Sequence, residues 1–387
     1  MYEAENRGVS LLTGSLSLPV EIVSRPGQFG VAARELIDSH AIALDTESNS
    51  FYHYPEQLCL IQIASRHKIY IIDTISLSDL SPLRDVLEDV SIKKVLHAAD
   101  NDIRSLDRHF GLHIRNMFDT SIAARFIGST RLSLAAIIED LLSISINKSK
   151  RLQRADWGRR PLSTEALEYA ATDIRHLLAL REVLHQRLRT LGRAAWVAEE
   201  CARIEEVRYT APNLETAFLS AKGGKALDGR GLAVLRSLFL FREEEARRQH
   251  RPLFMVLPDA TLIFLAASPE TALSEVPGLG QTGLKRFGQG LRQALRNGIT
   301  ASPIHRPRSI RAVRASEEQV QRLSRLKEWR TSLGSSLSLD PSLLWPLTSL
   351  ERLAKAPGTL SVELASDEIR QWQRDVVASS LKAYLSQ

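Results

Sequence analysis

Runs of apolar and β-branched residues near the start of the chain predict strands. From about residue 19 to 73 the pattern is rich in such runs, and only Arg66 and His67 separate the last two of them. A connection this short predicts an antiparallel hairpin that feeds a central sheet. A stretch from Pro26 to Asp38 predicts a helix between the first strands. The predicted strand segments are AIALDTE (41–47), QLCLIQIAS (57–65) and KIYIID (68–73).

Helical stretches alternate with short strands from residue 79 onward. KKVLHA predicts a strand, residues 100 to 110 a helix, and a further short strand ends at Phe118, before helices that reach about 142. A long helix is expected to begin near Ser163, a suitable N-cap with Glu165 in the first turn. A second helix is expected over about 193 to 209. The pattern predicts an α/β domain.

Composition changes mark the domain boundaries. Glycines gather in AKGGKALDGRG (221–231), and ASPIHRPRSIRAVRAS (301–316) carries prolines and arginines but no acid. The helical openings LAVLRSLFLFREE and VQRLSRLKEWRTS are alike, which predicts a divergent tandem repeat. The expected parts are an N-terminal extension (1–18), an α/β domain (19–220), a helical domain (228–299), a basic linker (300–316) and a second helical domain (317–387).

Charge and cysteine content narrow the class of protein. The 387 residues carry a formal net charge of +6, which favours an acidic partner such as nucleic acid, although proteins that bind none can show the same surplus. Two cysteines exclude a disulfide framework and a cysteine-rich zinc module. The sequence shows neither an apolar run of membrane-spanning length nor a signal peptide, so we expect a cytoplasmic protein that does not bind membranes.

Asp45 and Glu47 lie two positions apart on a predicted strand, so both project from one face while Leu44 and Thr46 take the other. Two neighbouring carboxylates on a buried strand repel unless a cation or a donor compensates them. A divalent metal ion suits this position. The alternative is chance, because an Asp-x-Glu triplet is expected about once in a chain of this size.

A further acid lies where a strand ends and a helix begins, in VLHAADNDIRSL. Asp102 and Asp100 compete for this place, which is where open α/β sheets bind ligands. Both also suit the first turn of a helix, where acids stabilise the helix dipole.

Tyr169 and Asp173 are one helical turn apart in EYAATDIRHL. They lie together on a face separate from the apolar stripe of this helix. An exposed pair of no consequence would show the same spacing. The stripe consists of Leu167, Ala170, Ala171, Ile174, Leu177 and Leu178.

Taken together and in order, these groups resemble the three motifs of the DEDD 3′–5′ exonucleases, in the subgroup whose third motif carries a tyrosine. Further segments resemble the ribonuclease D family over roughly residues 20 to 210. In that family the second acid follows a histidine by five positions, which selects Asp102 after His97 rather than Asp100. The segments are LDTES, QLCLIQIA, VLHAADNDIRSL, FDTSIAARFIG and QRADWGRRPLSTEALEYAATDIRHLL.

The resemblance implies an RNase H-like α/β domain with a mixed sheet and flanking helices, followed by two small all-α bundles. It also implies hydrolysis of RNA 3′ ends with two divalent ions, Mg²⁺ or Mn²⁺, for which carboxylates are suitable ligands. The expected metal ligands are Asp45, Glu47, Asp102 and Asp173. Tyr169 is expected to orient the attacking water, because a phenol with a pKa near ~10 is a poor base at neutral pH.

A basic segment, KSKRLQRADWGRRPL (148–162), precedes the third motif, and its first lysine is Lys148. The resemblance supports Lys150, Gln153, Trp157 and Arg160 as substrate-binding residues, while a solvated loop is the alternative. It also supports Asp156 and Pro161. The family often has an aspartate before the lysine, whereas this chain has Ser149, which puts any role of that acid in doubt.

The segment 228–299 resembles the helicase-and-RNase-D C-terminal domain, which assists nucleic-acid binding in its family. This likeness lies in the segments Leu235 to Arg242 and Val276-Pro-Gly-Leu-Gly280. The helix start near Gly278 and Gly280 could bind a phosphate through its backbone N–H groups, and an ordinary turn is the alternative. The final segment resembles a weaker second copy that lacks the glycine-rich turn.

The function expected from the sequence is metal-dependent 3′–5′ exoribonuclease activity that releases nucleoside 5′-monophosphates. RNA with a free 3′ end, including tRNA precursors, is the expected partner. Two alternatives stay open at this point: a DNA 3′–5′ exonuclease of the same superfamily, and a non-catalytic RNA-binding protein that keeps the fold. The sequence does not choose between Mg²⁺ and Mn²⁺ or give the oligomeric state.

Overall fold

A computed structural model describes residues 18–146, 149–306 and 315–385. Within them the chain forms two compact units, the first made of residues 18–47, 58–209 and 315–385 and the second of 48–57 and 210–306. Lys148, most of the expected extension 1–18 and residues 307–314 of the expected basic linker lie outside the described residues.

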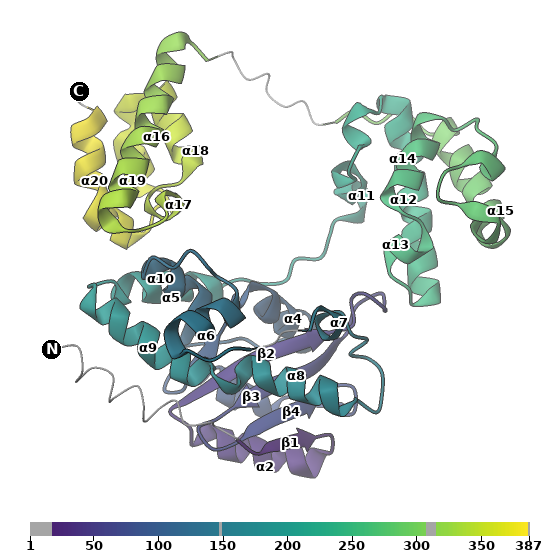
Figure 1. Cartoon of the computed structure of the whole chain (residues 1–387). Helices are drawn as coiled ribbons and strands as arrows, with labels where there is room; N and C mark the ends of the chain where they lie inside the picture. Colours follow the sequence, from purple (N-terminus) through teal and green to yellow (C-terminus); the bar gives the residue numbers. More distant parts are fainter. Residues whose placement is uncertain (1–17, 147–148, 307–314, 386–387) are drawn as a thin grey trace. The chain divides into compact units, whose positions relative to one another are not determined.

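A mixed sheet forms the centre of the first unit (Figure 1). Among the described residues it has six strands: β1 (Val20–Val23), β2 (Ala41–Ser48), β3 (Leu58–Ala64), β4 (Ile69–Asp73), β5 (Lys93–Leu96) and β6 (Met117–Asp119). They lie in the order β1-β4-β3-β2-β5-β6. The pairs β1–β4, β2–β5 and β5–β6 are parallel, whereas β3 and β4 are antiparallel. The mixed sheet agrees with the expected fold class.

The predicted hairpin is confirmed. Ile61 of β3 pairs with Ile72 of β4, and the Ser65 N–H closes the turn on the Lys68 carbonyl at 2.9 Å. Every residue of both strands is buried. Apart from Gln62 and Asp73, these strands carry apolar or aromatic residues on both faces, because helices cover both sides of the sheet.

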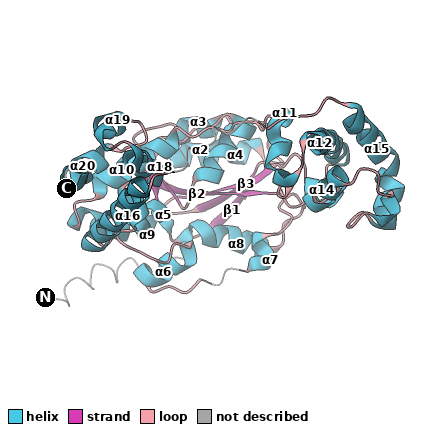
Figure 2. Cartoon of the chain, turned by 90° about the horizontal axis from the view of Figure 1, so that it is seen from above, coloured by secondary structure: helices cyan, strands magenta, loops and turns pink. Residues whose placement is uncertain are grey.

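Helices flank the sheet on both sides. Figure 2 shows the layer of α2, α3 and α4 on one side and that of α8 and α9 on the other. The long helix expected from Ser163 is divided at His176 into two helices. The helices of this part are α2 (Pro26–Ile37), α3 (Pro82–Leu87), α4 (Asp100–Phe110), α5 (Thr120–Phe126), α6 (Leu134–Leu142), α7 (Lys150–Gln153), α8 (Thr164–Arg175), α9 (Leu177–Thr190) and α10 (Ala194–Glu205).

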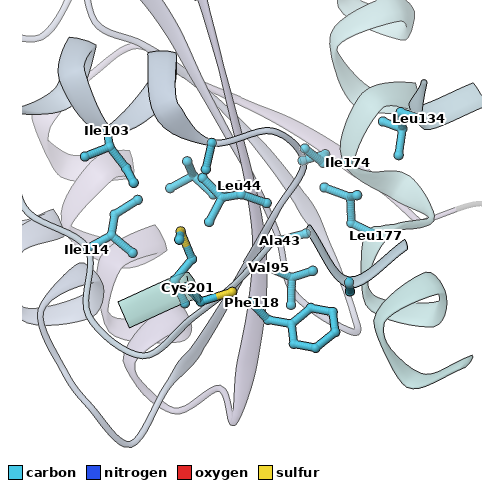
Figure 3. Packing of buried hydrophobic residues seen from close by; sticks show 14 of the residues in the cluster. Ala43, Leu44, Val95, Ile103, Ile114, Phe118, Leu134, Ile174, Leu177 and Cys201 are labelled. Atoms are coloured by element: carbon cyan, nitrogen blue, oxygen red, sulfur yellow. The ribbon is translucent and has the colours of Figure 1, made fainter. Parts of the chain in front are cut away.

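The two faces of β2 pack against different helices. Figure 3 shows Ile103 of α4 on one side of Leu44 and Ile174 of α8 and Leu177 of α9 on the other side, with Ala43. All of these side chains are buried. Since side chains alternate along a strand, positions 44 and 46 face α4, while 43, 45 and 47 face α8.

The C-terminal helices belong to the first unit. They share one hydrophobic core with the sheet and its helices. The ring of Trp372 stacks on Trp196 of α10 with 5.0 Å between centroids and meets Phe126 of α5 edge-on at 5.3 Å. These helices are α16 (Glu317–Leu337), α17 (Pro341–Leu344), α18 (Leu347–Lys355), η4 (Pro357–Thr359), α19 (Leu360–Ala365) and α20 (Gln371–Leu385).

The second unit is a helical bundle with its own core. Gly298 lies so close to α12 that an added Cβ would stand 2.5 Å from the Val234 Cα, and this contact requires glycine. The loop 48–57 belongs to this unit and joins it through a hydrogen bond from the Tyr54 hydroxyl to Glu243. Its helices are α11 (Leu214–Ala217), η1 (Phe218–Ser220), η2 (Gly224–Ala226), α12 (Gly229–Gln249), α13 (Leu253–Val256), α14 (Asp259–Ala267), η3 (Leu273–Glu275) and α15 (Gly280–Thr300).

The predicted likeness between the two helical segments extends beyond their openings. Helices α12, α13 and α14 have 21, 4 and 9 residues, and α16, α17 and α18 have the same lengths. Over the stretches that the structure describes, no helix has the length and apolar character needed to cross a membrane.

Candidate active site

Acidic side chains line a pocket at the end of β2. Asp45 and Glu47 project to the α8 side of this strand, where Tyr169 and Asp173 meet them. The pocket has a volume of about 230 Å³. The strand therefore supplies two of its carboxylates and α8 the third. The lining residues are Asp45, Thr46, Glu47, His97, Leu134, Gln153, Tyr169, Asp173 and Leu177.

Tyr169 and Asp173 form a buried pair. The side chain of Ser163 caps α8 by accepting a hydrogen bond from the Ala166 N–H at 3.2 Å, as predicted. Tyr169 is 9% exposed and Asp173 5% exposed, so the alternative of an inconsequential exposed pair is wrong.

The electrostatics of the pocket keep the Tyr169 phenol protonated. Burial raises its pKa, and the negative charges of Asp173, Glu47 and Asp45 raise it further. A hydrogen bond to Asp173 acts in the same direction. At neutral pH this phenol is a hydrogen-bonding group and not a base.

Asp102 approaches from the other side of β2. It lies in the first turn of α4, is buried, and accepts a hydrogen bond of 2.5 Å from the Thr46 hydroxyl. Burial raises the pKa of Asp102 to about 7, although the Thr46 hydrogen bond opposes this shift. Asp100 instead pairs with Arg104 at 2.9 Å in an exposed position.

Asp119 fixes the turn that leads into α4. Its carboxylate accepts hydrogen bonds from the N–H groups of Ala98 at 3.1 Å and Ala99 at 2.8 Å, and it also caps α5. Ala98 has a φ of +56°, in the left-handed region, so this turn needs such support. Asp119 is not among the residues predicted from the sequence, but an aspartate followed by Thr-Ser at a helix start is an N-cap signal that identifies it.

The donor set suits hard divalent cations. Asp45, Glu47 and Asp173 line one pocket, Asp102 is joined to it through Thr46, and carboxylate oxygens are the ligands that such ions prefer. The charges of three of these acids converge on Tyr169. Over the described residues, no group of three His, Cys, Asp or Glu side chains is arranged to hold one ion. Mg²⁺ is usually bound by one or two carboxylates and completes its coordination shell with water, so a set of three close side chains is not required for each ion.

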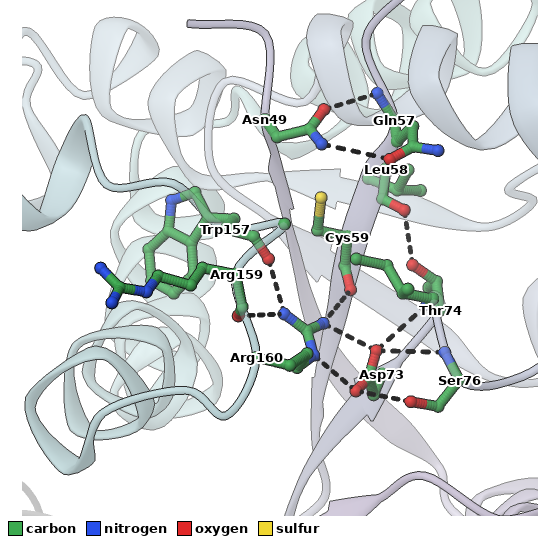
Figure 4. Close-up of polar contacts among 12 residues, drawn as sticks. Asn49, Gln57, Leu58, Cys59, Asp73, Thr74, Ser76, Trp157, Arg159 and Arg160 are labelled. Carbon is green, nitrogen blue, oxygen red and sulfur yellow. Dashed lines mark hydrogen bonds and ion pairs between the residues drawn. The ribbon is translucent and has the colours of Figure 1, made fainter. Parts of the chain in front are cut away.

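The predicted substrate-binding residues have different surroundings. Gln153 lines the pocket, and Lys150 is exposed on α7. Trp157 is only 1% exposed and packs against Tyr169 with 6.0 Å between ring centroids, so stacking on an RNA base is not open to it. Arg160 forms an ion pair with Asp73 at 2.7 Å (Figure 4). A direct phosphate contact by Arg160 would require existing hydrogen bonds to break.

Comparison with known proteins places these observations in a family. Residues 20–189 match the model for the 3′–5′ exonuclease domain, and residues 231–295 match the HRDC domain. Ribonuclease D of Desulfotalea psychrophila is 31% identical over 318 residues, which cover 81% of this chain and 84% of that protein. This chain belongs to the ribonuclease D family. The resemblance inferred from the motifs is thereby confirmed.

Solved structures agree with the assignment. The catalytic core of RRP6 from Trypanosoma brucei superposes with a TM-score of 0.66 at 26% identity, covering 74% of this chain and 81% of that one. Escherichia coli RNase D, described as an exoribonuclease involved in structured RNA processing, has the same fold, with a TM-score of 0.73 at 24% identity over 95% of this chain and 99% of that one.

The family assignment establishes the general activity. The chain is a 3′–5′ exoribonuclease that acts in RNA processing. Exonucleases of this type typically depend on divalent metal ions, in agreement with the acidic pocket.

Proposed function

We propose that this chain shortens RNA one nucleotide at a time from its 3′ end and releases nucleoside 5′-monophosphates, with two Mg²⁺ or Mn²⁺ ions in the acidic pocket. The observation that carries the proposal is the convergence of Asp45, Glu47, Tyr169 and Asp173 on one pocket. Strand β2 and helix α8 bring them together from distant parts of the chain.

Asp45, Glu47, Asp102 and Asp173 are the ligands that would hold the ions. A bound pair of divalent ions lowers the pKa of the attacking water and stabilises the leaving 3′-oxygen. The protein contributes the fixed positions of the carboxylates, which the sheet and α8 set.

Tyr169 orients the attacking water in this proposal. Its hydroxyl proton is directed to Asp173, so the phenol oxygen keeps lone pairs that accept a hydrogen bond from water. The water is then held beside the scissile phosphate without a change in the protonation state of the phenol.

The rest of the pocket suits the terminal nucleotide. Leu134 and Leu177 give the pocket an apolar wall for the base, and the Gln153 amide offers both a donor and an acceptor. Lys150 lies exposed on the same short helix as Gln153 and is placed to meet the RNA backbone.

Structured RNAs such as tRNA precursors are the proposed substrates, and the cytoplasm is the proposed location. The HRDC domain supports nucleic-acid binding. The start of α15, where Gly278 and Gly280 have φ values of +80° and +59°, offers backbone N–H groups to phosphate. Cys59 and Cys201 are both buried and unbridged, as in a reducing compartment.

One assay tests the proposal. 5′-Labelled RNA and DNA of one sequence are incubated with Mg²⁺, Mn²⁺ or a chelator and with the wild type, Asp45→Asn or Asp100→Asn. We expect stepwise shortening of RNA that Asp45→Asn and the chelator abolish. Asp100→Asn is the matched control, because this exposed acid pairs with Arg104, and it should behave like the wild type. Unshortened RNA would support a non-catalytic protein, and faster loss of DNA would support a DNA exonuclease.

A further inference from the structure

All five N–H groups of the Arg160 guanidinium have acceptors (Figure 4). Nε and Nη2 each donate to a carboxylate oxygen of Asp73 at 2.7 Å. Nη1 donates to the carbonyls of Trp157 at 2.7 Å and Arg159 at 2.9 Å, and Nη2 also donates to the carbonyl of Cys59 at 3.3 Å. Arginine has five N–H donors and no acceptor, so none is left for an RNA phosphate.

The carboxylate of Asp73 also accepts hydrogen bonds from several donors. It is 5% exposed and also accepts hydrogen bonds from the Ser76 hydroxyl at 2.9 Å and the Ile75 N–H at 3.1 Å. Burial opposes its ionisation, but the hydrogen bonds from Arg160 and Ser76 outweigh burial and lower the pKa of Asp73. Removing either member of the pair leaves the other charge without its partner in a poorly solvated place.

The Asp73–Arg160 pair joins the loop before α8 to the sheet. Asp73 is the last residue of β4, and Cys59 belongs to β3. Helix α8 packs on these same two strands. The loop that carries Arg160 and the helix that carries Tyr169 therefore both contact β3 and β4.

Trp157 is the part of the loop that reaches Tyr169. Its side chain is fully buried, and its ring lies 6.0 Å from that of Tyr169 at an interplanar angle of 40°. Arg160 holds the carbonyl of Trp157 directly. A shift of the loop would thus move the surface against which the Tyr169 ring packs.

We propose that Asp73 and Arg160 form a latch that holds Trp157 against Tyr169 and thereby positions the phenol in the acidic pocket. The inference rests on the proposed function, in which Tyr169 orients the attacking water. Both members of the latch are positioning residues, because neither lines the pocket. A misplacement of about 1 Å at a catalytic group lowers turnover by as much as about 100-fold, so the latch acts on kcat.

The test combines latch variants with Tyr169→Phe. Arg160→Gln, Arg160→Lys and Asp73→Asn are made in the wild type and in the Tyr169→Phe background. Arg159→Gln is the matched control, because this neighbouring arginine is exposed and contributes only its carbonyl to the latch. The kcat and KM for 5′-labelled RNA with Mg²⁺ and the Tm are measured for each.

We expect Arg160→Gln and Asp73→Asn to lower kcat by about 10-fold or more while KM changes by less than about 2-fold. Arg160→Lys keeps the charge but not the two-pronged contact, so its kcat should fall between those of the wild type and Arg160→Gln. In the Tyr169→Phe background the same substitutions should lower kcat by less than about 2-fold, because the hydroxyl that they position is already absent. Arg159→Gln should match the wild type in kcat.

Three results would overturn the latch. A higher KM with unchanged kcat in Arg160→Gln would show a direct RNA contact. An equal loss of kcat in the wild-type and Tyr169→Phe backgrounds would show a general structural role. If Arg160→Gln does not fold, Arg160→Lys is used to distinguish these outcomes. If Tyr169→Phe keeps the full kcat, the phenol does not orient water, and both the proposed function of Tyr169 and the latch are wrong. If Tyr169→Phe lowers kcat and the latch variants lower it by the same further factor in that background, only the latch is wrong.

Discussion

The hydroxyl of Thr46 donates a hydrogen bond of 2.5 Å to the carboxylate of Asp102. Thr46 stands between Asp45 and Glu47 on β2, so alternation turns its side chain toward α4 while those two acids face α8. The bond joins the fourth acid to the other three across the strand. Thr46, which lies between the two acids of the first motif, thus orients the carboxylate of Asp102 in the second motif.

Thr46→Val tests this connection. The substitution keeps the shape of the side chain but removes the donor, which should lower stability by roughly 1–3 kcal/mol and leave Asp102 less well oriented. We expect a higher Mg²⁺ concentration for half-maximal RNA hydrolysis. Thr46→Ser retains the hydroxyl and should stay close to the wild type. An unchanged Mg²⁺ requirement in Thr46→Val would show that the bond does not support ion binding.

The pH dependence of stability should report on Asp102. Its pKa is raised to about 7 in the folded chain, so between about pH 4 and pH 7 the folded state binds more protons than the unfolded state. The contribution of Asp102 to stability therefore falls as pH rises through this range. With a chelator present, the Tm difference between wild type and Asp102→Asn should shift in favour of the variant from about pH 5 to about pH 8. A pH-independent difference would contradict the shifted pKa.

Tyr169→Phe should lower turnover far more than RNA affinity. The phenylalanine ring still packs against Trp157, but it lacks the oxygen that accepts a hydrogen bond from water. We expect a fall in kcat of about 100-fold at nearly constant KM. Single-turnover rates at saturating enzyme, together with direct RNA binding, distinguish the two effects. If binding is lost instead, the phenol contacts RNA and does not orient water.

Trp372→Ala should weaken the first unit as a whole. Trp372 contacts both Trp196 and Phe126 in a cluster of three aromatic rings, and its indole N–H donates to Glu200 at 3.0 Å. Removing such a buried aromatic side chain costs about 3–5 kcal/mol. Urea unfolding should show this loss, while Val362→Ala, at a residue 67% exposed in the same segment, should leave the midpoint unchanged. An unchanged midpoint in Trp372→Ala would mean that the aromatic contact contributes little.

Local patterns in the sequence were sufficient for much of the fold. The hairpin, the cap at Ser163 and the position of Asp45 and Glu47 on one face follow from spacing and side-chain chemistry, which act over a few residues. The break at His176 was missed, because the apolar stripe continues through it into the next helix.

Long-range partners explain the parts that the sequence did not predict. Arg160 lies in a basic segment beside a tryptophan, and a guanidinium binds a phosphate and a carboxylate equally well. Its partner Asp73 is 87 positions away, and no local pattern links the two. Trp157 presents the same difficulty, because the sequence does not distinguish a tryptophan that stacks on a base from one that packs in a core.

The three acidic motifs come from β2, α4 and α8, and α8 is the last of these elements in the chain. Until α8 packs on β3 and β4, neither Tyr169 nor Asp173 lies opposite the first motif. Because α8 ends at Arg175, all three motifs have been synthesised before half of the 387 residues are made. A nascent chain that stops before this helix lacks two of the proposed site residues, whereas one that stops within the C-terminal helices already carries all of them.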